Sequence, residues 1–124
     1  MRIATAEDAA RILAPMFAAA EAERIVVIHL DPEQKLLGMT VEAAGEADDV
    51  ALPVAAIAAS ALRLGADGIV VAHNHPSGNA EPSEADRDST RRLAEVVRSI
   101  GVRLIDHLVL GGEETTSFRA LGLL

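Results

Sequence analysis

The chain has 124 residues, of which 50% are hydrophobic and 24% are charged, and its formal net charge is −8. A chain of this length and apolar content is expected to form one compact domain, here residues 1–124, and not a disordered acidic tail. The absence of cysteine excludes disulfide bonds, thiol nucleophiles and thiolate metal sites. Only two aromatic residues and a surplus of acids disfavour single-strand stacking and tight duplex binding of nucleic acids.

The N-terminal segment indicates neither export nor membrane insertion. Glu7 and Asp8 occur early, and no apolar signal-peptide region follows them. No run of about eighteen apolar residues is found anywhere in the sequence. We therefore expect a cytoplasmic protein with no membrane contact, whose oligomeric state the sequence leaves open.

The first elements expected along the chain are a helix and a β-hairpin. Residues 5–22 have the pattern of a helix with Thr5 as N-cap, and Pro15 should kink it or split it in two. The β-branched run 25–30 predicts a strand, and a turn separates it from a second strand over 36–43.

A second helix should follow an acidic loop at residues 45–52. Proline favours the first position of a helix, so Pro53 marks its start, and Gly65 marks its end. Apolar residues at helical spacing predict its buried face: Val54, Ile57, Ala58, Ala61 and Leu62.

The remaining chain predicts a strand over 68–72, a third helix from Ser83 to about Ile100, and a strand over 102–110. The tail should add a short strand and a final turn. The apolar stripe of the third helix comprises Leu93, Val96, Val97 and Ile100. Because the first two strands form an antiparallel hairpin and helices are interspersed, we expect an α/β fold of the α+β type, with a mixed sheet flanked by helices.

The segment from His73 to Asp86 carries the clearest chemical signal. Residues two apart at the end of a strand point the same way, so His73 and His75 can converge on one point. Asp86 would return to that point in the first turn of the third helix. Two imidazoles and one carboxylate suit Zn²⁺ and leave a fourth position for water, which the metal can activate as a nucleophile.

Each part of this signal has a structural alternative. Ser83 and Asp86 also fit a helix-capping pair, in which a serine N-cap is followed three residues later by an acid. A His-x-His pair at a strand end is often structural. Because the two patterns occur together in one segment, we favour the metal site, while Asp86 can still cap the helix.

The combination of His-x-His-Pro, seven intervening residues and Ser-x-x-Asp resembles the JAMM motif of the JAB/MPN metalloprotease superfamily. The segments that resemble its RadC-like branch are AHNHPSG, PSEAD, LIDHLVLG and SFRALGLL. The likeness extends from about residue 5 to the C-terminus. It implies a cytidine-deaminase-like architecture, a zinc site made by His73, His75 and Asp86, and a role for Ser83 in stabilising an oxyanion.

The resemblance also points to Glu23 as the general acid/base. RadC-like sequences place their glutamate before a stretch of the form ExxxxxxLD, and residues 23–31 fit it. Without the resemblance, Glu23 would rank no higher than Glu21, and its alternative role is to cap the helix region or solvate the strand end.

Two features depart from the family pattern. Asn79 stands where RadC-like proteins commonly have aspartate, a loop change that should leave the metal ligands intact. Such proteins also often carry an upstream helix-hairpin-helix-like domain, for which this sequence has no room. We therefore expect any DNA association that depends on that domain to be weakened here.

The other two histidines are interpreted as residues of the fold. His29 lies in a strand next to a turn, and His107 follows Asp106 in a later strand. Because a complete ligand set exists elsewhere, neither is expected to bind the metal. Asp106 and His107 belong to a segment that resembles the family, so a role in supporting a ligand stays open for them.

Three functions are carried forward. The first is a zinc-dependent metallohydrolase that cleaves a peptide or isopeptide bond in a protein or peptide substrate. The second is a DNA-repair-associated accessory protein of the RadC-like kind, which the net charge disfavours. The third is a metal-binding module that recognises a protein without cleaving it.

Overall fold

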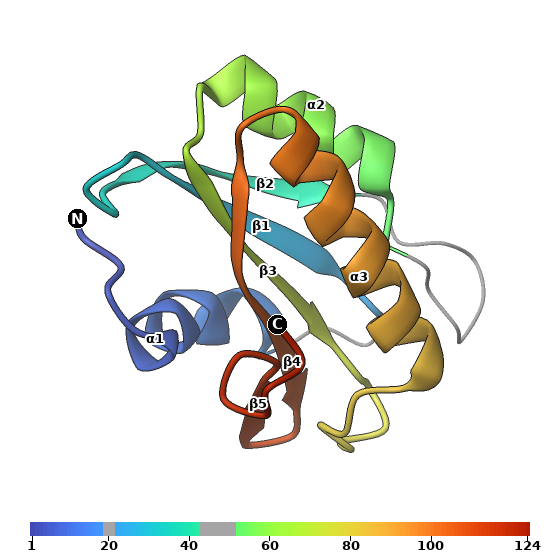
Figure 1. The fold of residues 1–124 in the computed structure, drawn as a ribbon. Helices are drawn as coiled ribbons and strands as arrows, with labels where there is room; N and C mark the ends of the chain where they lie inside the picture. The colour runs from blue at the N-terminus through green and yellow to red at the C-terminus, as the bar shows by residue number, and fades with distance from the viewer. Residues whose placement is uncertain (19–21, 43–51) are drawn as a thin grey trace.

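The computed structural model describes residues 1–18, 22–42 and 52–124. Within these ranges, five strands form one mixed sheet with three helices packed on its two faces (Figure 1). Among the described residues, no helix combines the length and the apolar character needed to cross a membrane. The elements in chain order are α1 (Ala6–Phe17), β1 (Ile25–Leu30), β2 (Leu36–Glu42), α2 (Val54–Leu64), β3 (Gly68–Asn74), α3 (Glu84–Ser99), β4 (Arg103–Gly111) and β5 (Glu114–Ser117).

The strand order is β2-β1-β3-β4-β5, which places β3 at the centre of the sheet. β1 pairs antiparallel with both β2 and β3, whereas β3 pairs parallel with β4. A parallel pair needs a crossover connection, and α3 provides it. Every residue of β1 and β3 is buried, as expected for strands covered on both faces. The expected mixed sheet flanked by helices is therefore confirmed.

Two apolar layers hold the helices on the sheet. On one face, α2 and α3 bury Ile57, Leu93 and Val97 against alternate residues of β1 and β3. Helix α1 lies on the other face (Figure 1). It buries Leu13 and Phe17 there. Since side chains alternate along a strand, residues 69, 71 and 73 of β3 point to the face that α3 covers. His73 is therefore directed towards the helix that carries Asp86.

Helix α1 begins as expected but is shorter. Thr5 is its N-cap and forms a capping box with Asp8, each side chain accepting a hydrogen bond from the other's backbone N–H. The helix ends at Phe17, so the predicted extension to residue 22 is wrong at Ala22, and residues 19–21 lie outside the described ranges. Pro15 does not split the helix, which is continuous from Ala6 to Phe17.

The other helices match their predicted bounds closely. Gly65 ends α2 in the left-handed conformation, with φ of 66°, and Ser83 is the N-cap of α3. Two residues assigned to buried stripes are instead exposed, Leu62 at 59% and Val96 at 39%. Both lie at the edge of the apolar stripe of their helix, and the layer that packs on the helix does not extend over that edge. The predicted end of the second strand at residue 43 and the acidic loop up to residue 51 lie outside the described ranges.

Candidate metal centre

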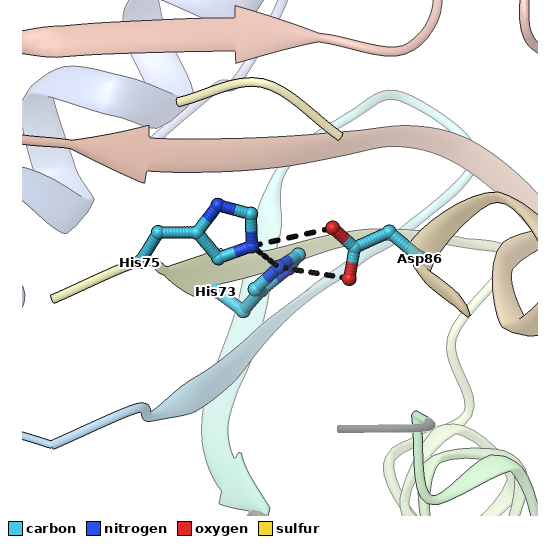
Figure 2. A group of neighbouring side chains, drawn as sticks. All are labelled: His73, His75 and Asp86. Atoms are coloured by element: carbon cyan, nitrogen blue, oxygen red, sulfur yellow. Dashed lines mark hydrogen bonds and ion pairs between the residues drawn. The ribbon is translucent and has the colours of Figure 1, made fainter. Parts of the chain in front are cut away.

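Three side chains converge where strand β3 ends and helix α3 begins (Figure 2). His73 is the penultimate residue of β3, His75 follows the strand, and Asp86 lies in the first turn of α3. The two Nε2 atoms are 3.0 Å apart. Asp86 Oδ1 is 3.2 Å from His73 Nε2, and Asp86 Oδ2 is 3.2 Å from His75 Nε2. The structure thus brings together the three ligands predicted from the sequence.

The orientation of His75 is set by the loop that follows it. Its Nδ1 is 2.7 Å from the backbone carbonyl oxygen of Asn79. A carbonyl oxygen can only accept, so Nδ1 carries a proton and donates it. In the neutral ring, Nε2 then presents a lone pair to the other two ligands. Because the Asn79 backbone makes this contact, the exchange of aspartate for asparagine leaves it intact.

His73 is supported from behind by a histidine of strand β4. Its Nδ1 lies 2.7 Å from Nε2 of His107, which is fully buried. The ring of His107 stacks on Phe118, with centroids 4.5 Å apart. Burial, assisted by the positive charge available to His73, lowers the pKa of His107 to about 3. His107 is therefore neutral near pH 7, and it lies outside the His73–His75–Asp86 group.

Asp86 serves the helix and the site at the same time. Its backbone N–H donates to Ser83 Oγ at 3.0 Å, and its Oδ2 accepts from the Ser83 N–H at 2.8 Å. Burial would raise the pKa of this carboxyl, but the hydrogen bond and charge that a protonated His73 supplies, together with the bonds from Ser83, outweigh it and lower the pKa. Asp86 is ionised, and its predicted capping pair with Ser83 is confirmed. Its carboxylate also belongs to the group that could hold a metal ion.

The spacing of these atoms fits a bound metal ion. Ligand bonds of about 2.0–2.1 Å in tetrahedral geometry place ligand atoms roughly 3.3 Å apart, and the observed separations are 3.0–3.2 Å. Two imidazole nitrogens and an anionic oxygen at such separations repel one another unless a proton or a cation lies among them. The His73–His75–Asp86 group could therefore hold a divalent metal ion.

Glu23 lies just before strand β1, which pairs with the strand that carries His73. Ile25, two residues later, pairs with His73 in the sheet register. Glu23 is half-buried, and its Oε2 is enclosed. The backbone on either side of it is held by Asn74, whose Oδ1 accepts from the Arg24 N–H at 2.7 Å and whose Nδ2 donates to the Ala22 carbonyl at 3.1 Å.

Asn74 is the residue that sequence reasoning missed. The available signal was an amide at the end of a strand that is apolar up to His73, since a buried amide must find both a donor and an acceptor. Its partners could not be named, because they are fifty and fifty-two residues away in sequence.

A cleft adjoins His75, whereas His29 lies apart from the group. A cleft of about 380 Å³ opens beside His75, between the end of α1 and the hairpin of β4 and β5; its lining includes Phe17, Leu110, Glu113 and Glu114. His29 is outside the ligand group and bonds through Nε2 to Thr40 Oγ1 at 2.9 Å, as expected for a residue of the fold.

The family model for the RadC-like JAB domain matches residues 3–123. The chain belongs to the RadC-like JAB family. This RadC-like domain is 36% identical over 107 residues to UPF0758 protein YkfG of Escherichia coli K12, with 86% of the chain and 68% of that protein covered. It is 38% identical over 112 residues to UPF0758 protein STH371 of Symbiobacterium thermophilum, with 90% of the chain and 48% of that protein covered.

The RadC-like domain spans about half the length of several curated relatives. It covers 45% of UPF0758 protein Bpet3149 of Bordetella petrii, to which it is 36% identical over 102 residues, or 82% of the chain. None of these three names states a reaction or a substrate. The family expected from the motif is therefore confirmed, and the activity is a separate question.

Proposed function

We propose that this RadC-like domain is a zinc-dependent metallohydrolase that cleaves a peptide or isopeptide bond. The observation that carries the proposal is the convergence of His73 Nε2, His75 Nε2 and the Asp86 carboxylate at the spacing of a metal coordination sphere. These three residues would hold Zn²⁺, which when bound lowers the pKa of water and polarises a carbonyl group.

Glu23 is assigned the proton transfer. Hydrolysis of an amide requires a group that takes a proton from the attacking water and passes one to the leaving amine nitrogen. A carboxylate can do both in turn. Support for Glu23 comes from its position next to β3 and from the two hydrogen bonds by which Asn74 holds its neighbours.

Ser83 is assigned the stabilisation of negative charge on the substrate carbonyl. Its Oγ accepts a hydrogen bond from the Asp86 N–H. That bond uses a lone pair of Oγ, so the hydroxyl proton remains available for donation to the developing oxyanion.

Substrate approach is assigned to the cleft beside His75. Its volume of about 380 Å³ and its mixed lining of apolar and acidic residues suit a segment of polypeptide. The net charge of −8 weighs against DNA, whose phosphates are bound through lysine and arginine. A protein or peptide is therefore the proposed partner.

Replacement of Glu23 by Gln tests the assignment. The amide has nearly the same shape but cannot accept the proton, so Glu23→Gln should keep the metal and reduce turnover by about 10²–10⁴-fold. Bound metal is measured by elemental analysis, and turnover with a peptide and isopeptide library supplied with zinc. Glu33→Gln, which alters a carboxylate that is exposed in the β1–β2 turn, is the matched control and should retain full activity.

Other outcomes would replace the proposal. Unchanged turnover in Glu23→Gln would remove Glu23 from the mechanism. A second outcome is that the wild type binds stoichiometric metal, which His73→Ala loses, and binds peptide without turnover. That result would indicate an interaction module. Salt-dependent binding of duplex or branched DNA without hydrolysis would favour the accessory protein.

A further inference from the structure

A chain of hydrogen bonds runs behind the ligands and returns to the helix that carries Asp86. His73 Nδ1 is 2.7 Å from His107 Nε2, and His107 Nδ1 is 2.6 Å from Thr90 Oγ1. Thr90 Oγ1 is in turn 2.5 Å from the backbone carbonyl oxygen of Asp86. His73, His107, Thr90 and Asp86 are all buried, so water does not compete for these bonds.

The donor and the acceptor of each hydrogen bond in this series follow from the Asp86 backbone carbonyl, at which the series ends. The Asp86 carbonyl can only accept, so the single hydroxyl proton of Thr90 is donated to it. Thr90 Oγ1 must then accept from His107, which places the proton of this neutral ring on Nδ1. His107 Nε2 consequently accepts from His73 Nδ1, and the second nitrogen of His73 is left with its lone pair facing the other ligands.

We propose that His107 is a positioning residue that holds His73 in the tautomer and ring orientation in which Nε2 can bind a metal ion, and that Thr90 fixes the tautomer of His107. The inference rests on the metal-binding part of the proposed function. Metal-binding histidines usually donate their other N–H to a carboxylate, a carbonyl or water. An uncharged imidazole in this place orients His73 without adding a further negative charge beside Asp86.

The fold holds His107 so that it can do this. His107 pairs with Val71 of β3 in the sheet register. Because Val71 and His73 are two residues apart in one strand, His107 lies on the same face of the sheet as His73. Phe118 stacks on the other side of the ring, at an interplanar angle of 19°. The ring is thus fixed by the sheet register, by the stack and by two hydrogen bonds.

Metal affinity of two His107 variants provides the first test. His107→Leu removes the acceptor and should weaken metal binding by about 10–100-fold, as is usual when such a partner of a ligand is lost. His107→Gln offers a side-chain carbonyl to His73 Nδ1–H and should restore part of the affinity. Affinity is measured by competition with a chromophoric chelator, and ligand geometry by the visible absorption of the Co²⁺-loaded protein.

The matched control is His29→Leu. His29 is also fully buried and also bonds a threonine hydroxyl, but it lies away from the ligands. Its loss should lower the unfolding temperature while leaving the metal affinity at the wild-type value. An equal loss of affinity in His29→Leu and His107→Leu would show that the effect is general destabilisation and would overturn the inference.

The second test needs no metal. Long-range ¹H–¹⁵N NMR of the metal-free wild type at mildly alkaline pH should show His73 with its proton on Nδ1, and Thr90→Val should remove the preference of His107 for one tautomer. A proton found on Nε2 of His73 would overturn the inference even if the metal binds. If the wild type binds no metal, the proposed function fails, and the tautomer of His73 still decides the inference.

Discussion

His29 and His107 are both inaccessible to solvent, but their ring nitrogens meet different surroundings. Both nitrogens of His107 are hydrogen-bonded. Among the described residues, His29 has a partner only at Nε2, while its Nδ1 is buried without one. Burial lowers the pKa of His29; Glu42 opposes this by its negative charge, and Arg63 adds to it.

A pH dependence of stability follows for His29. Its folded-state pKa lies below the value of 6.5 that applies to the unfolded chain, so the unfolded state binds more protons in acid. The contribution of His29 to the free energy of unfolding is fully present above pH 6.5. It decreases as the pH falls below that value, by at most ~1.4 kcal/mol per pH unit. Urea unfolding of the wild type and His29→Gln between neutral pH and about pH 5, above the range where carboxylates titrate, measures it.

His29→Gln keeps a group that can bond Thr40 but cannot be protonated, so its stability should change less over the same range. Charges common to both proteins, including those of the metal centre, cancel in the difference. Parallel curves for wild type and variant would contradict the prediction.

Among individual residues, the sequence predicted the group that could hold a metal ion but not the residues packed behind it. His73, His75 and Asp86 occur within one short segment, where alternation along a strand and the start of a helix determine their directions. His107 lies thirty-four residues from His73, and their contact depends on the parallel register of β3 and β4. Sequence spacing contains no information on that register, so the role of His107 stayed open.

At the level of elements, the end of β4 fixes the loop that orients His75. Gly111 is the last residue of β4, and an added Cβ there would lie 2.5 Å from the Ala80 backbone nitrogen and 2.6 Å from the Asn79 carbonyl carbon. Both atoms belong to backbone, so the loop itself would have to move. The Asn79 carbonyl that binds His75 Nδ1 would move with it.

Gly111→Ala should therefore weaken metal binding and destabilise the fold by about 1–3 kcal/mol. Calorimetric metal titration and urea unfolding measure the two effects. Gly38→Ala is the control, because a Cβ at Gly38 would meet only the Leu64 side chain, at an ordinary 3.5 Å. Wild-type metal affinity in Gly111→Ala would show that the loop can shift without disturbing His75.

The elements themselves were largely predictable because local rules determine them. β-branched runs gave the strands, and the caps at Thr5, Ser83 and Gly65 lie where their side chains or backbone conformations require. The exposed Leu62 and Val96 show that local rules do not fully predict which residues of a helix are buried. Helical periodicity identifies an apolar stripe, but the part of it that is buried depends on how far the neighbouring layers extend.

For the whole molecule, the group that could hold a metal ion joins two layers of the fold. His73 belongs to the central strand of the sheet, and Asp86 belongs to the helix that covers it. Since the ligands come together only in the folded chain, metal binding should stabilise it. At a free metal concentration one hundred times Kd, the gain is about 2.7 kcal/mol, or several degrees in Tm for a domain of this size.

Thermal unfolding with zinc and with a chelator measures this gain. The same comparison on His73→Ala should show almost no difference between the two conditions. A wild-type Tm that does not respond to zinc would mean that the three ligands do not form a strong site.

Asn74 determines which parts of the site keep their mutual distances when the molecule moves. Its amide ties the backbone beside Glu23 to the strand that carries His73. A sliding of α3 over the sheet would change the position of Asp86 relative to the histidines, but it would leave Glu23 and His73 in one rigid unit.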